Sequence, residues 1–144
     1  MTFNMPNSKV MTIIFSLIFI CLACNNNSIS SMHGAKLPTV NIQKNDKLVS
    51  PTKVEVNSQG IWFASEGSLG FVKLIDEKGT ELARGFLTTQ ADWMTSKPVL
   101  FSTELIFNAK DSVNGMLIIH NDPGPGSGDE AGEQISFTIP ITFQ

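Results

Sequence analysis

The chain has 144 residues, a formal net charge of −3 and a hydrophobic content of 42%. This length allows one ordinary folded domain, and the slightly acidic balance argues against binding to nucleic acid or to anionic lipid through charge alone. The two cysteines, Cys21 and Cys24, both lie near the start. The rest of the sequence therefore contains neither a disulfide framework nor a cysteine-based metal site.

The first element is a short apolar segment that ends just before Cys24. Lys9 is the only charge ahead of it, and residues 10–23 are almost entirely apolar. A helix needs about 20 apolar residues to cross a bilayer, so this segment is too short to be a membrane span. We interpret residues 1–23 as a secretion signal peptide.

Cys24 follows a small residue, Ala23, and opens a polar segment. This junction resembles the bacterial lipobox, at which signal peptidase II cuts and the new N-terminal cysteine is acylated. The resemblance implies a lipid anchor at Cys24, with palmitate among its acyl chains, and a place outside the cytoplasm in the cell envelope. In a host with two membranes, we expect the outer membrane. One acyl chain binds only marginally, at about 0.8 kcal/mol per buried methylene, so several chains are needed for a durable tether.

The segment after the lipidation site is polar and lacks any periodic pattern. We interpret residues 24–38 as the acylated N-terminus followed by a flexible linker. From residue 39 to residue 144 the pattern changes to short apolar runs separated by turn residues. This pattern predicts that residues 39–144 form a single folded domain.

The apolar runs of this domain have the two-residue period of β-strands. Val54 and Val56 alternate with polar residues, and residues 71–75 and 80–88 flank a turn at residues 76–79 that predicts a hairpin. Two further runs are Phe101, Thr103, Leu105 and Phe107 on one face, and residues 116–119. No stretch of ten residues shows a helical period. The fold predicted is an immunoglobulin-like antiparallel β-sandwich of about seven strands.

The last run has the clearest alternation. Its predicted core face consists of Ile135, Phe137, Ile139, Ile141 and Phe143. Its predicted outer face consists of Ser136, Thr138, Pro140 and Thr142. Because proline has no N–H group for a neighbouring strand, Pro140 predicts an edge position or a bulge.

A series of short motifs follows in the same part of the chain: Val49-Ser50-Pro51, Trp62-Phe63, Glu66-Gly67, Asp76 with Gly79, Asp92-Trp93-Met94, residues 101–107, Asn121-Asp122-Pro123 and Ile139-Pro140-Ile141. In this order they resemble the immunoglobulin-like domain of bacterial spore germination and related envelope lipoproteins. The resemblance implies an extracytoplasmic β-sandwich attached to the envelope. It implies no particular ligand, and the companion sporulation domain of some relatives is missing.

The most unusual segment lies between residues 122 and 133, where four carboxylates stand among glycines and prolines. They are Asp122, Asp129, Glu130 and Glu133. Oxygen-rich loops can bind calcium, but the spaced aspartates of a known calcium loop are not present. We expect a solvated loop without metal or cofactor, and these four residues are the metal candidates that the sequence offers.

Two other groups of residues could carry a function. An enzyme site would have to be assembled from Asp92, Glu66 and His120, but their spacing provides no nucleophile with an adjacent base. Trp62 and Trp93 could stack on a ligand, but in a sandwich without a disulfide we expect them to anchor loops or core.

The function predicted is that of a noncatalytic, membrane-anchored module that contacts an envelope protein or the cell wall. Two alternatives stay open. One is a purely structural module of envelope assembly, and the other, less favoured, is an envelope hydrolase.

Overall fold

The computed structural model describes residues 36–124 and 132–143. Every helix or strand in these two ranges is a β-strand, which confirms the predicted all-β class. The predicted signal peptide (1–23), Cys24 and most of the linker (24–38) lie outside the described residues. Within them, no helix has the length and apolar character needed to cross a membrane.

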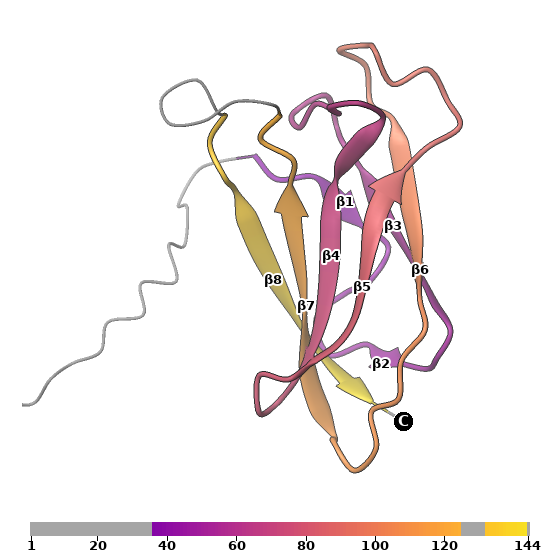
Figure 1. Cartoon of the computed structure of the whole chain (residues 1–144), viewed down its shortest axis with the longest axis vertical. Helices are drawn as coiled ribbons and strands as arrows, with labels where there is room; N and C mark the ends of the chain where they lie inside the picture. The colour runs from indigo at the N-terminus through magenta and orange to yellow at the C-terminus, as the bar shows by residue number, and fades with distance from the viewer. Residues whose placement is uncertain (1–35, 125–131, 144) are drawn as a thin grey trace, which may run out of the picture. The chain divides into compact units, whose positions relative to one another are not determined.

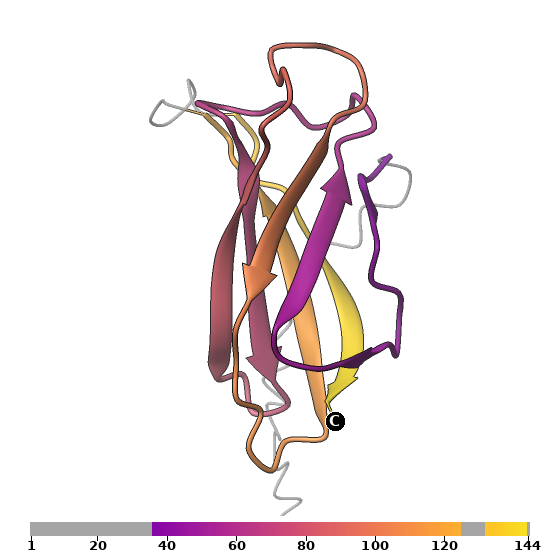
Figure 2. The same ribbon diagram turned by 90° about the vertical axis from the view of Figure 1, so that its right-hand side faces the viewer.

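The strands in the described ranges are β1 (Thr39–Val40), β2 (Lys47–Leu48), β3 (Thr52–Asn57), β4 (Ser68–Asp76), β5 (Glu81–Thr88), β6 (Leu100–Leu105), β7 (Asn114–Asn121) and β8 (Ser136–Phe143). They form one eight-stranded sheet in the order β1-β3-β6-β5-β4-β7-β8-β2. All neighbours are antiparallel except β2 and β8, which are parallel. The sheet curls into a half-barrel, so that β3 and β6 lie opposite β7 and β8 (Figures 1 and 2).

The core lies inside the curl and is built from alternate residues of the longer strands. The side chains that are fully buried include Val54, Val56, Leu69, Val72, Leu74, Leu87, Phe101, Leu105, Leu117 and Ile119. The predicted inward faces of the runs at 54–56 and 101–105 are therefore confirmed. Phe107 lies beyond the end of β6 and is half-buried against this core.

The predicted hairpin is confirmed as β4 and β5, which pair antiparallel. Its turn is held by the carboxylate of Asp76, whose Oδ1 accepts the N–H groups of Lys78 (2.9 Å) and Thr80 (2.7 Å). The backbone adds a bond from the Gly79 N–H to the Asp76 carbonyl (3.0 Å). An aspartate that caps its own turn in this way keeps the two strands in register.

The predicted alternation of the last strand is also confirmed. Ile141 and Phe143 of β8 are buried, and Ile135, Phe137 and Ile139 pack half-buried against the core. The carbonyl of Pro140 accepts the N–H of Asn45 (2.8 Å) on the side away from β7. Since the nitrogen and carbonyl of one strand residue point the same way, the proline nitrogen faces this outer side. There β2 pairs with β8 only at Thr142 and Phe143, so β8 is the second strand from the end of the sheet and not the predicted edge strand. Pro140 lies just beyond this short pairing, where no N–H is required.

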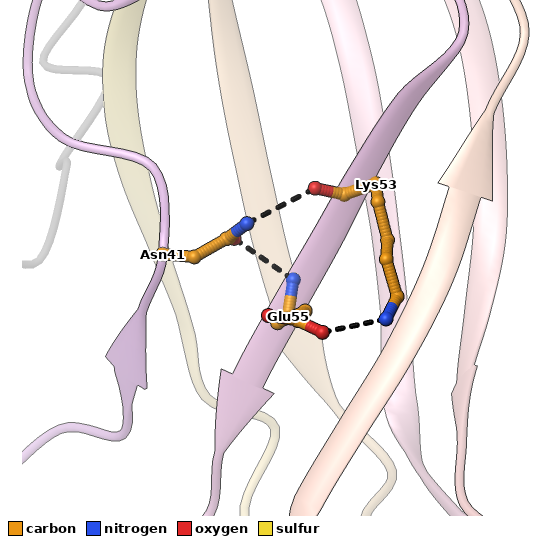
Figure 3. A network of polar contacts seen from close by, with 3 residues as sticks. All are labelled: Asn41, Lys53 and Glu55. Atoms are coloured by element: carbon orange, nitrogen blue, oxygen red, sulfur yellow. Dashed lines mark hydrogen bonds and ion pairs between the residues drawn. The ribbon is translucent and has the colours of Figure 1, made fainter.

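The N-terminal segment connects the two ends of the sheet, because β1 pairs with β3 and β2 pairs with β8. Asn41 follows β1, and its backbone N–H still donates to the Glu55 carbonyl of β3 (3.1 Å). Its side chain adds two further bonds to the same strand (Figure 3). Its Nδ2 donates to the Lys53 carbonyl (3.1 Å), and its Oδ1 accepts the Glu55 N–H (2.8 Å). The side chains of Lys53 and Glu55 form an ion pair at 2.6 Å beside it.

Candidate functional site

The two ends of the acidic segment, which is predicted as a solvated loop, are joined by hydrogen bonds. Asp122 Oδ1 accepts the Gly124 N–H (3.0 Å), so this carboxylate caps a turn. The carboxamide of Asn121 accepts the Ile135 N–H (2.7 Å) and donates to the Glu133 carbonyl (2.8 Å). The base of the loop is therefore held by Asn121 and by backbone bonds.

Of the four metal candidates, the structure describes two. Asp122 has the capping role just given, and Glu133 is exposed, while Asp129 and Glu130 lie outside the described residues. In the part of the chain that the structure describes, no group of three or more His, Cys, Asp or Glu side chains could hold a metal ion. That the complete set of four binds no calcium stays a prediction.

An open cleft of about 370 Å³ lies beside the base of this loop. It is lined by residues 61–65 on one side and by Asn121, Asp122, Pro123, Gly124, Gly132, Glu133 and Ile135 on the other. Trp62 borders the cleft but is itself only 5% exposed, and it packs edge-on against Phe137 with ring centroids 5.7 Å apart. Trp62 is thus the core anchor that we expect from the sequence.

The residues of the alternative enzyme site have separate local roles. Asp92 Oδ1 accepts the Met94 N–H (3.1 Å), Glu66 has a left-handed backbone (φ 50°) in the turn before β4, and His120 lies in β7. Among the described residues, no hydrogen bond or ion pair joins any two of these three side chains. The structure does bring two of the sequence motifs together, since a Cβ placed on Gly67 would lie 3.5 Å from Trp93 Nε1.

A different surface, which the sequence analysis missed, covers the outer side of β4, β5 and β7. We call it the aromatic face and define it as Phe71, Lys73, Arg84, Phe86, Met116, Ile118 and His120. These side chains alternate with the buried ones of the same strands. Strand register places Phe71 directly between Phe86 and His120.

The rings of the aromatic face contact one another in an ordered row. His120 stacks on Phe71 with centroids 4.5 Å apart and an interplanar angle of 17°. Phe86 meets the same ring edge-on at 6.4 Å and 66°. Such contacts favour one orientation of the rings. Phe86 is nevertheless 64% exposed, and Met116 is 40% exposed.

Two cations lie close to the central ring. Lys73 Nζ is 5.5 Å, and Arg84 Cζ 5.1 Å, from the centroid of Phe71, both within the range of cation–π attraction. Arg84 is also held by Glu81 through two hydrogen bonds of 2.9 Å each. That pairing lowers the pKa of Glu81 and raises the pKa of Arg84.

The pKa of His120 is affected by its burial and by the charges of this surface. Burial is the main reason why its pKa lies below the ordinary value, and the positive charges of Lys73 and Arg84 lower it further. Its Nε2 atom is buried without a hydrogen-bond partner among the residues described. The aromatic face thus combines apolar rings with a local positive potential.

The signal for this surface was present in the sequence. In the run from Phe71 to Ile75 both alternating sets are apolar except for Lys73, whereas a strand with one wet face would have polar residues at every second position. The turn residues that predict the hairpin carry no information about what covers the second face of this run.

Comparison with family models, with curated proteins and with solved structures gives no match for this chain.

Proposed function

We propose that this chain is an extracytoplasmic lipoprotein of the cell envelope, anchored through acyl chains on Cys24. Its folded part is an immunoglobulin-like module that binds another envelope component through the aromatic face and has no catalytic role. The short apolar segment before Cys24 and the polar linker after it support the anchor.

The order of the strands in the sheet supports the proposal of an immunoglobulin-like sandwich. The sheet is continuous between β5 and β6 through a single residue pair, Thr88 with Ser102. If the sheet is divided at this pair, one half contains β1-β3-β6 and the other contains β5-β4-β7-β8-β2. This matches strands A, B and E facing C, F and G in immunoglobulin sandwiches, with the first strand split between the two halves. The proposed kinship with the immunoglobulin-like domain of spore germination lipoproteins is compatible with this order.

The observation that carries the binding function is the exposure of Phe86, which belongs to an ordered row of rings beside the chain's single arginine. Met116, further along the same face, is exposed as well. Aromatic residues, methionine and arginine are the types enriched at protein interfaces. Exposed apolar patches of this kind mark interaction surfaces on soluble domains. The main alternative is a purely structural module of envelope assembly.

Site-specific photo-cross-linking tests this proposal. A photoreactive phenylalanine analogue replaces Phe86 in the full chain, expressed in the cell that makes it. Phe63 is the matched control, because it is 60% exposed but lies in the loop before β4, off the aromatic face. We expect a discrete adduct from position 86 and none of the same size from position 63. If position 86 gives no adduct, or if both positions give the same one, the aromatic face is not a binding site.

A further inference from the structure

We propose that the partner of the aromatic face is an acidic segment of another protein, an inference that rests on the binding function proposed above. Its carboxylates would lie against Lys73 and Arg84, and its apolar side chains would cover Phe86 and Met116. Four features of the face lead to this choice.

The first feature is the sign of the charge. The chain has 13 acidic and 10 basic residues, yet the outer positions of β4, β5, β7 and β8 carry Lys73 and Arg84 against a single carboxylate, Glu81. The outer residues of β8 are serine, threonine and proline. This side of an acidic protein is therefore locally cationic, which favours an anionic partner.

The second feature is that the two cations differ in how they are held. The guanidinium of Arg84 is held in place because its Nε and Nη2 atoms donate to the two carboxylate oxygens of Glu81. Little side-chain entropy is therefore lost when a further carboxylate binds to it. Lys73 forms no ion pair within 36–124 and 132–143 and is half-buried beside Phe71. Its ammonium group is available for a carboxylate of the partner.

The third feature argues against a second copy of this chain. In a symmetric contact centred on Phe71, Lys73 and Arg84 of one copy would lie close to the same residues of the other, because both cations lie within 5.5 Å of the centroid of this ring. Like charges in an interface oppose association. An acidic partner replaces this repulsion by attraction.

The fourth feature is the shape of the apolar part. Ile118 lies opposite Lys73 and two residues from His120, and Met116 lies further along β7, opposite Ile75. Their aliphatic side chains favour apolar side chains of a protein. A carbohydrate would gain most from flat exposed rings, and here Phe71 is already covered by His120. Proteins thus fit the face better than acidic polysaccharides do.

Selection from a library of short random peptides tests the inference on the full-length chain in detergent. We expect the selected peptides to be enriched in Asp and Glu next to apolar residues, and to lose affinity for Phe86→Ser. Charge reversal by Lys73→Glu or Arg84→Glu should lower the affinity of the selected peptides by about tenfold. Added salt should lower this affinity as well. Lys53→Glu is the matched control, since Lys53 is an exposed cation paired with Glu55 on β3, away from the face.

The milder variants Lys73→Gln and Arg84→Gln serve as the test if a reversal impairs folding, which the melting temperature would reveal. Selected peptides without acidic enrichment, or with affinity unchanged by either reversal, would overturn the inference. Polygalacturonate that binds with the same charge dependence while peptides do not would replace the protein partner by an acidic polysaccharide. Sedimentation that shows a dimer lost in Phe86→Ser would replace it by a second copy.

The same variants separate this inference from the proposed function. If the adduct at position 86 persists at full yield in Lys73→Glu and Arg84→Glu, the face binds a partner that is not acidic, and only the inference of this subsection is wrong. If the adduct is missing in the unmodified background, both are wrong.

Discussion

Ser58 shows how a single polar side chain can connect strands far apart in the sequence. It is only 3% exposed, and its Oγ accepts the N–H of Val99 at 3.0 Å. Its own N–H donates to the Val99 carbonyl at 2.9 Å. The end of β3 is thereby fastened to the residue that precedes β6.

Replacement of Ser58 by alanine should leave the Val99 N–H buried without a partner. We expect the free energy of unfolding to fall by about 1–3 kcal/mol, the cost of an unsatisfied buried donor. Urea titration of the purified protein measures this change. Ser136→Ala, at an exposed position of β8, should change stability by less than about 0.5 kcal/mol, and an equal loss at both positions would contradict the role of Ser58.

At the scale of the element, the β4–β5 hairpin depends on the ionised form of Asp76. Hydrogen bonds from the turn, that of Thr80 first, lower the pKa of its carboxyl below the ordinary value despite the opposing effect of burial. A carboxyl whose pKa is lower in the folded state takes up protons more readily in the unfolded chain. Its contribution to stability is therefore complete above the ordinary pKa and is lost as the pH falls through the folded value.

We expect the free energy of unfolding to decrease as the pH drops below about 3.9, the ordinary pKa of an aspartate. Asp76→Asn keeps an oxygen acceptor for the turn but cannot titrate, so this part of the decrease should disappear in the variant. Denaturation at a series of pH values checks the difference. An acid limb of the same steepness in both proteins would show that Asp76 does not contribute to it.

The two faces of β8 should respond differently to truncation. Phe137 is half-buried and packs against Trp62. Phe137→Ala should therefore lower the free energy of unfolding by about 2–4 kcal/mol, toward the lower side of values for fully buried phenylalanines. Thr138→Ala on the exposed face should cost less than about 0.5 kcal/mol. Chemical denaturation compares the two, and similar costs would be incompatible with the inward direction of Phe137.

At the scale of the whole molecule, the proposed anchor at Cys24 would determine where the domain acts. We expect mass spectrometry of the mature protein to show an N-terminal Cys24 carrying acyl chains, because the predicted signal peptide ends at Ala23, directly before Cys24. Cys24→Ser should move the protein from the membrane fraction to the soluble fraction, since the acyl chains hold it there. An unmodified N-terminus at another residue would refute the lipidation site.

Much of the strand content could be read from the sequence, because the two-residue period is a local property of each strand. Val54 and Val56, the hairpin around residues 76–79 and the inward face of β8 follow from alternation and turn residues alone. The missing N–H group of Pro140 likewise predicts that its nitrogen faces away from a fully paired neighbour. These predictions needed no knowledge of which strands are neighbours.

The aromatic face and the course of the N-terminal segment required the folded chain. Phe71, Phe86 and His120 belong to three strands, and only the register of β4 with β5 and β7 places their rings together. Asn41 and Lys53 likewise come together because β1 pairs with β3 before the chain crosses to β8. Local pattern specifies which way a side chain points from its own strand, whereas strand order and register, set by packing between distant segments, specify which side chains it meets.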